Sequence, residues 1–441
     1  MFKVSQMALI AASLSLIPGF GSAEEYVQGE QTFQGHSYLS ETSQSTENKV
    51  EKTTFETTEP ITFEREPVGL TFDRHFSPIT GADAMLTILR GYQALDDALV
   101  PSSVGDKSFG MIAGRIGKLL FIEGILTSTQ MIAQHEVFGH GYRAREFHVP
   151  NLRYRVTPWS GWISMNAAKF NQLSSNEKIA IMAGGMEGTS VLANRIRTRW
   201  FNSSANSIDS REAHLYLNAS LDQTMYVLDT KRRGDKTFSA GHDVINYINE
   251  VNRWYQKNAI DTHKLRRKIL LDFVDPYLFY SAYSLGNYIV EGSQIWEYPM
   301  ISIGEYQYLP ATRIALAPYG PEYQLINFIK GPEQSYIATM RYGNTVGRRS
   351  SALGLDVLKL ISSDLLFIDA KADLWHQPKM FATTASTAKG HFGAALSLIA
   401  RYRIAPKVDI TGQAGYKTTG YMPGEALKHS PILRIGFAAY L

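Results

Sequence analysis

Cysteine is absent from this 441-residue chain, which excludes disulfide bonds and any metal site built on thiolates. A strong excess of one charge is also absent. The formal net charge of +3 is too small for this length to indicate nucleic acid as a partner. With 44% hydrophobic and 19% charged residues, the composition is that of a folded protein with a well-buried core.

A long uninterrupted apolar run is missing as well. The N-terminal run from Met7 to Ile17 is shorter than the roughly 20 residues that cross a bilayer as a helix. Lys3 precedes this run, and the small residues Gly21, Ser22 and Ala23 follow it. That order predicts a secretory signal peptide over residues 1–23, with cleavage after Ala23. We therefore expect an exported protein of a bacterial envelope, in the outer membrane or the periplasm.

Composition and periodicity divide the remaining chain into three parts. Residues 24–70 are rich in Glu, Thr, Ser and Gln and have little to bury, which predicts a disordered segment. Residues 71–300 carry apolar residues at three- and four-residue spacings, which predicts a mainly helical domain. Within it we expect helices at about 212–231, 241–258 and 262–292, and another that begins near Ser174 with Glu177 close behind.

In residues 301–441 the apolar period changes from 3.6 to 2, which predicts about eight antiparallel strands. The clearest strands lie at 365–375, 391–405, 407–417 and 433–441, and weaker ones near 308–317, 322–330, 335–343 and 351–361. The predicted fold class is therefore α+β, a helical domain followed by a C-terminal antiparallel β-barrel.

Charges on one face of these strands indicate where the barrel lies. Asp369, Lys371 and Asp373 alternate with an apolar face, which fits lipid outside and a salt-bridged interior. The C-terminal region resembles bacterial outer-membrane barrel proteins, although it ends in Leu441 rather than in phenylalanine or tryptophan. The resemblance implies a barrel held in outer-membrane lipid. A soluble barrel or sandwich also alternates, so it stays open as an alternative.

The stretch "QHEVFGHGYRARE", residues 134–146, carries the candidate chemistry. Residues five apart on a regular helix differ by about 140° around its axis, so His135 and His140 would point to different sides. One extra residue bulging out of the helix would let both face one metal ion, and such π-bulges recur at functional sites. Gly139 is the residue best able to take the distorted backbone.

The string "HEVFGH" has the form H-E-x-x-G-H and is similar to the zinc motif of the dipeptidyl peptidase III family of metallopeptidases. The similarity is confined to the motif, and that family's acidic motif around its third ligand is not found. It implies that His135 and His140 bind Zn²⁺ and that Glu136 is the general base. It also implies a glutamate on a later helix as the third protein ligand.

Glu187 is the preferred third ligand, because Gly184, Gly185 and Gly188 around it would let its helix approach the metal helix closely. A structural helix glutamate partnered by Arg195 or Arg197 is the alternative. Other candidate ligands are Glu146, His148, His242, Asp272, Asp275 and Glu291, and a donor for the oxyanion is sought among Tyr142, Arg143 and His148.

The sequence thus predicts an envelope zinc metallopeptidase that hydrolyses a peptide or protein substrate and is anchored in outer-membrane lipid. Two alternatives remain at this point. One is a non-enzymatic outer-membrane barrel with a helical accessory domain in a structural or transport role. The other is a soluble periplasmic binding protein of two domains.

Overall fold

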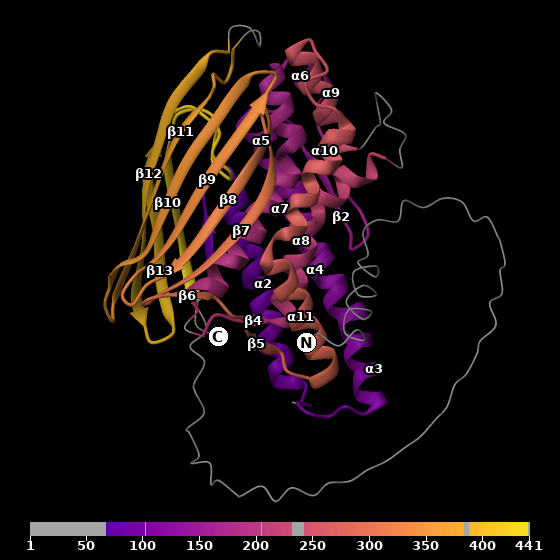
Figure 1. Cartoon of the computed structure of the whole chain (residues 1–441), viewed down its shortest axis with the longest axis vertical. Coiled ribbons are helices and arrows are strands. Elements are labelled where there is room, and N and C mark those ends of the chain that lie inside the picture. Colours follow the sequence, from indigo (N-terminus) through magenta and orange to yellow (C-terminus); the bar gives the residue numbers. More distant parts are fainter. Residues whose placement is uncertain (1–67, 102, 204, 232–241, 383–387, 440–441) are drawn as a thin grey trace, which may run out of the picture.

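A computed structural model describes residues 68–439 except 102, 204, 232–241 and 383–387. The expected signal peptide and most of the segment 24–70 lie outside the described residues. Helices fill one side of the molecule and a large curved sheet covers the other (Figure 1). The helical elements are α2 (Pro78–Leu99), α3 (Phe109–Lys118), η1 (Leu119–Glu123), α4 (Gly124–His135), η2 (Glu136–His140), α5 (Gly141–Glu146), α6 (Ala167–Gln172), α7 (Ser175–Asn202), α8 (Ser210–Asp229), α9 (Asp243–Tyr255), α10 (Thr262–Ile269), η3 (Leu270–Val274) and α11 (Pro276–Glu291).

Local sequence signals set several helix ends. Ser174 and Glu177 form a reciprocal capping box at the start of α7, where side-chain and backbone groups satisfy each other. The helix expected over 262–292 is interrupted, because Asp275 caps a new helix whose first residue is Pro276. The helices expected near 212–231 and 241–258 are confirmed as α8 and α9. No helix in the described part of the chain is long and apolar enough to cross a membrane.

The sheet is antiparallel and has ten strands in the order β1-β14-β13-β12-β11-β10-β9-β8-β7-β6. Its members are β1 (Val68–Phe72), β6 (Ile301–Ile303), β7 (Tyr306–Ala317), β8 (Gly320–Lys330), β9 (Ser335–Thr345), β10 (Arg348–Ser362), β11 (Leu366–Pro378), β12 (Gly390–Ala405), β13 (Val408–Lys417) and β14 (Ser430–Ala439). Two short antiparallel pairs stand apart from it: β2 (Arg153–Val156) with β3 (Gly161–Ser164), and β4 (Ser207–Asp209) with β5 (Ile295–Glu297).

The strand positions predicted after residue 301 are confirmed, since β7 to β14 follow one another by antiparallel pairing. The closed barrel is wrong for the described residues. The sheet stays open, and its edges are β6 and β1. The edge strand β1 pairs with β14 from Val68 to Phe72, so the segment expected to be disordered up to residue 70 already enters the sheet at Val68.

Side chains along the long strands alternate as the sequence indicates. On β12, Leu396 and Leu398 are 61% and 49% exposed, whereas Ser397 between them is buried. On β14, Arg434 is buried and bonds Glu425 at 2.9 Å, with exposed leucine and isoleucine on either side. The outer face of the sheet is therefore apolar, and charged residues lie beneath it, which is the reverse of a water-exposed sheet.

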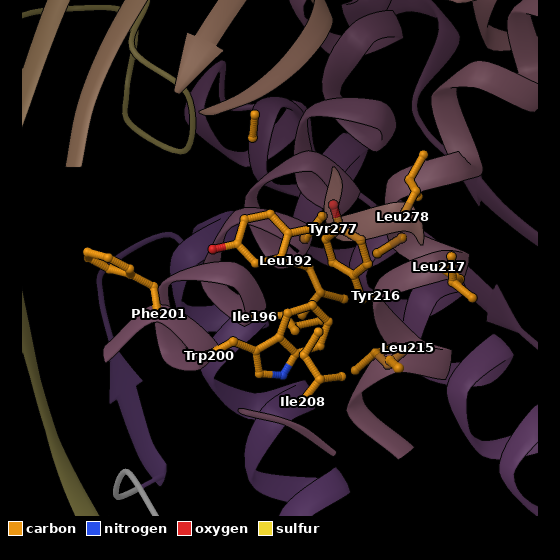
Figure 2. Close-up of a cluster of buried hydrophobic side chains, with 14 of the residues drawn as sticks. Leu192, Ile196, Trp200, Phe201, Ile208, Leu215, Tyr216, Leu217, Tyr277 and Leu278 are labelled. Carbon is orange, nitrogen blue, oxygen red and sulfur yellow. The ribbon is translucent and has the colours of Figure 1, made fainter. Parts of the chain in front are cut away.

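Helices fill the concave side that a closed barrel would enclose. Trp200, Tyr216 and Tyr277 from α7, α8 and α11 pack together at the centre of the helical core (Figure 2). This cluster continues into Phe328 on β8, whose ring meets that of Phe201 at 5.2 Å. The shared core fixes the helices against the sheet, and it fixes the positions of α4, α7 and α8 relative to one another.

Candidate metal centre

The two motif histidines lie at the ends of a π-helical turn. Residues Glu136–His140 form η2, a π-helix between α4 and α5. A π-helical turn contains one residue more than an α-helical turn, which is the extra residue that the five-residue spacing of the histidines requires. As a result the side chains converge, and His135 Nε2 lies 3.1 Å from His140 Nε2. The predicted bulge and the predicted convergence are both present.

Close contact with α7 explains why the bulge is seated here. Gly139 lies directly against Gly184 and Gly185, and a Cβ on Gly139 would come within 2.7 Å of the Gly185 Cα. A Cβ on Gly188 would come within 2.7 Å of the Gln134 carbonyl oxygen. These four glycines let the two helix backbones touch, as the sequence indicates for α7.

A third donor completes the group, and it is Asp243 at the start of α9. Asp243 Oδ2 lies 3.1 Å from His135 Nε2 and 3.2 Å from His140 Nε2. With the 3.1 Å between the nitrogens, the three atoms form a nearly equilateral triangle. Ligands bound to zinc at ~2.0–2.1 Å in a tetrahedron stand about 3.3 Å apart, so the triangle has the size of one face of such a site.

Each histidine is oriented through its other ring nitrogen. His135 Nδ1 donates to Asp222 Oδ2 at 2.9 Å, and Thr189 Oγ1 donates to the same oxygen at 2.8 Å. His140 Nδ1 donates to the Ile181 carbonyl oxygen at 2.5 Å. Both Nε2 atoms are thereby turned toward Asp243, which is the carboxylate or carbonyl support that metal-binding histidines commonly have.

The electrostatics of the group favour a positive charge inside the triangle. Burial lowers the pKa of His140, but Asp243 beside it outweighs the burial and the net shift is upward. For His135 burial again lowers the pKa, and Asp222 more than compensates, so that its pKa is also raised. Three ligand atoms that face one another at about 3 Å need a cation between them, whether protons or a metal ion.

Gly185 leaves space beside the ligand atoms. A Cβ at this position would come closer than 3.0 Å to His135 Nε2 and its ring neighbours, a distance that real Cβ atoms essentially never show. The absence of a side chain therefore keeps open the place where an ion would contact the nitrogens. The donor set, its supporting bonds and this opening together fit a bound metal ion such as Zn²⁺.

Glu136 follows the first ligand directly and lies next to the short β2–β3 pair. The side chain is 8% exposed, and burial raises the pKa of its carboxyl group. A Cβ on Gly161, the first residue of β3, would come within 2.7 Å of Glu136 Cγ and 3.0 Å of Glu136 Oε1. The β3 backbone thus passes close to the carboxylate and limits where it can move.

Glu187, the expected third ligand, is not brought into this group. Its Oε2 accepts from Arg143 Nε at 2.9 Å, and its Oε1 accepts from Arg143 at 2.5 Å and from the Gly424 backbone at 2.8 Å. Arg143 is buried without any exposed surface, and a buried guanidinium needs a paired carboxylate. The structure therefore places Asp243 where the sequence interpretation placed Glu187.

The other candidates have different tasks. Three of the carboxylates make other hydrogen bonds or ion pairs: Glu146 with Arg143, Asp272 with Thr224 and the Ile314 backbone, and Glu291 with Lys107. Asp275 caps α11 and His242 caps α9. His148 is exposed. Of the suggested oxyanion donors, Arg143 is occupied by Glu187 and Glu146. Within the described residues, His135, His140 and Asp243 form the group able to hold one metal ion.

Comparison with known proteins adds little to this geometry. No protein-family model matches the chain, and no curated protein is significantly similar to it. Among solved structures, a NanC porin aligns with 32% of this chain and 76% of its own length, at 12% sequence identity and a TM-score of 0.24. A likeness at that score carries no argument about fold or function.

Proposed function

We propose that this protein is a zinc-dependent hydrolase of peptide bonds in the bacterial cell envelope. The observation that carries the proposal is the triangle of His135 Nε2, His140 Nε2 and Asp243 Oδ2, with sides of 3.1, 3.1 and 3.2 Å. A site of three protein ligands leaves a position for water or substrate, as catalytic zinc sites do. The neighbouring Glu136 supplies the acid–base group that such a reaction requires.

The chain's own residues divide the work. His135, His140 and Asp243 would hold the ion, which lowers the pKa of water and polarises a carbonyl group when bound. Glu136 takes the proton of the attacking water on its carboxylate and returns it to the leaving amine. Burial of Glu136 raises the pKa of its carboxyl group, which makes that carboxylate a better proton acceptor. Asp222 keeps His135 in the tautomer that presents Nε2.

A second metal chemistry uses the same donor types. Two histidines and one carboxylate also bind Fe²⁺ in mononuclear oxygenases. Glu136 beside the first ligand favours hydrolysis over oxygen chemistry, because a general base has a direct role only in the former. In the non-enzymatic alternative, His135 and His140 would be core residues held by Asp222 and Asp243 as ordinary ion pairs.

We also propose that the sheet lies in the outer membrane, with its outer face in contact with lipid. Support comes from the exposed apolar side chains that alternate with buried polar ones on β11 to β14. Beneath that face, Lys371 lies 3.4 Å from Asp356, and Arg341 lies 3.7 Å from Glu322. A bilayer-spanning sheet shows this distribution of apolar and charged residues.

The experiment combines elemental analysis with peptide hydrolysis by purified protein. Glu136→Gln should retain the metal and lose hydrolysis, whereas Asp243→Ala should lose both. Asp261→Ala is a matched control, since Asp261 also stands at a helix start but caps α10 away from the site. It should cost only about 1 kcal/mol of stability and leave metal and activity intact. If Asp261→Ala lost the metal and Asp243→Ala kept it, the assignment of Asp243 as a metal ligand would be refuted.

A further inference from the structure

The second half of α2 and the helices next to it expose apolar side chains and bury polar ones. In the second half of α2, Ile88, Leu95 and Leu99 are 51%, 57% and 70% exposed, whereas Arg90 and Gln93 on the same helix are buried. A helix that faces water normally exposes its charged residues and buries its apolar ones. This surface of α2 is therefore not built to face water.

The same reversal continues on the neighbouring helices. Phe109 on α3 is 87% exposed, Phe121, Ile122 and Ile125 around η1 are 72%, 53% and 37% exposed, and Phe279 on α11 is 62% exposed. Together with Ile88, Leu95 and Leu99 they form what we call the apolar helical face. The helices that carry them pack against one another, and a group of exposed large apolar side chains on adjoining helices indicates a binding surface.

Charged groups under this face are satisfied within the protein. Lys118 Nζ lies 2.6 Å from Asp96 Oδ2 and 3.4 Å from Glu123 Oε1. Arg211 also bonds Asp96, at 2.9 Å. These side chains are almost fully withdrawn from solvent, so pairing them inside removes most of the charge from this face. Asp97, which also bonds Arg211 at 2.7 Å, stays 38% exposed. Such an arrangement suits an environment that cannot solvate charge.

Dimensions and position also agree with lipid as the occupant. Phe109 and Ile125 lie on the consecutive helical elements α3, η1 and α4, and sixteen residues at ~1.5 Å each span about 24 Å. The apolar band of outer-membrane proteins is about 25 Å tall. In addition α2 packs against β1, so the helical face adjoins an edge of the sheet whose outer surface is apolar. An open sheet in lipid needs such cover on its edges.

Interfacial residues stand at the upper end of this face. The β2–β3 pair exposes Arg153 and Arg155 on β2, Trp162 at 46% and the turn residue Trp159 at 58%. Tryptophan and arginine are typical of the boundary between hydrocarbon and water. Figure 1 shows α3 and α11 toward the lower end of the molecule, and α9 and α10 toward the upper end.

We propose that the apolar helical face is embedded in membrane lipid, with the β2–β3 pair at the lipid–water interface. The helices and the sheet then present apolar surfaces to the same bilayer from two sides of the protein. Glu136 lies beside Gly161 of β3, so this placement puts the metal group at the level of the interface. As a consequence that rests on the proposed function, the substrate is a peptide segment presented at the membrane surface.

The natural absence of cysteine allows a direct test by single-cysteine labelling. A fluorophore is attached to Ile125→Cys on the helical face, to Leu396→Cys on the outer face of the sheet, and to Lys264→Cys on exposed α10. The full-length protein is placed in phosphatidylethanolamine–phosphatidylglycerol vesicles that contain nitroxide-labelled lipid. Iodide serves as the water-soluble quencher, and Phe121→Cys is a second probe of the helical face.

The expected result is quenching by lipid nitroxide at Ile125→Cys equal to that at Leu396→Cys, and protection from iodide at both. Lys264→Cys should show the opposite pattern, and a Trp159→Cys label should be quenched best by nitroxides near the headgroup. Iodide quenching at Ile125→Cys and Phe121→Cys as strong as at Lys264→Cys would overturn the proposal. Protection of both from both quenchers would overturn it too, because a second copy or a protein partner then covers the face. None of these outcomes depends on whether peptides are hydrolysed.

Discussion

Substitution of Gly185 by alanine should remove the bound metal without unfolding the protein. The added methyl group would lie closer than 3.0 Å to three atoms of the His135 ring, and the backbone of α7 cannot move away freely because α2, α8 and α9 also pack against it. The ring therefore has to rotate. It would leave the triangle and its 2.9 Å bond to Asp222. One of three ligands is then withdrawn, and we expect the metal to be lost.

The stability of the metal-free protein should change modestly. Loss of a hydrogen bond to a charged group costs ~1.5–3 kcal/mol, and a strained side-chain torsion costs ~0.5–1.5 kcal/mol. Alanine in place of glycine inside a helix returns ~0.5–1 kcal/mol. The net destabilisation is about 1–4 kcal/mol, which leaves a folded protein without metal.

Gly286→Ala is the matched control, because Gly286 is inside α11 and a Cβ there meets no heavy atom within 4 Å. It should keep the metal and gain ~0.5–1 kcal/mol. Zinc content and denaturant unfolding are measured on both variants with and without added zinc. A Gly185→Ala protein that retains stoichiometric metal and full activity would refute the geometry described for His135.

Other substitutions probe the surroundings of the site and the sheet. Asp222→Asn should weaken metal affinity by about 10–100-fold without unfolding the protein, since only the orientation of His135 is affected; competition with a chelator measures this, and unchanged affinity would contradict it. Burial lowers the pKa of His214 to about 4, so the unfolded chain takes up a proton below about pH 6.5 while the folded protein does not. Stability should therefore fall by about 2 kcal/mol from pH 7 to pH 5, and His214→Gln should remove that contribution, which unfolding at both pH values will check. Leu396→Arg, on the outer face of the sheet, should destabilise the protein in bilayers by ~2–4 kcal/mol, and no effect there would count against lipid contact.

Local signals in the sequence predict the bulged helix that carries His135 and His140. The five-residue spacing of His135 and His140 demands a bulge, and that demand follows from helix geometry alone. The glycines of α7 also indicated a close helix crossing. The third ligand could not be reached in this way. Asp243 approaches the histidines only through the packing of α9, and nothing in its own neighbourhood distinguishes it from the adjacent candidate His242.

Strand positions could be predicted because alternation is local, whereas closure of the sheet could not. Closure depends on what fills the concave side, and here α2, α7 and α8 occupy it and share a core with β7 to β10. The pairing of Val68 with Ala439 brings together strands far apart in the sequence, and no periodicity in either segment indicates it. Glu187 is likewise paired by tertiary packing, with Arg143 44 residues away, and no local pattern indicates that pair.

The proposed function depends most directly on the metal content of the native protein. Full-length protein purified without chelators or added metal is analysed for all first-row transition metals, beside Asp243→Ala prepared in the same way. We expect about one zinc ion per chain in the native protein and none in the variant. A native protein without stoichiometric metal, or one that retains its metal when Asp243 is removed, would contradict the metal site of His135, His140 and Asp243.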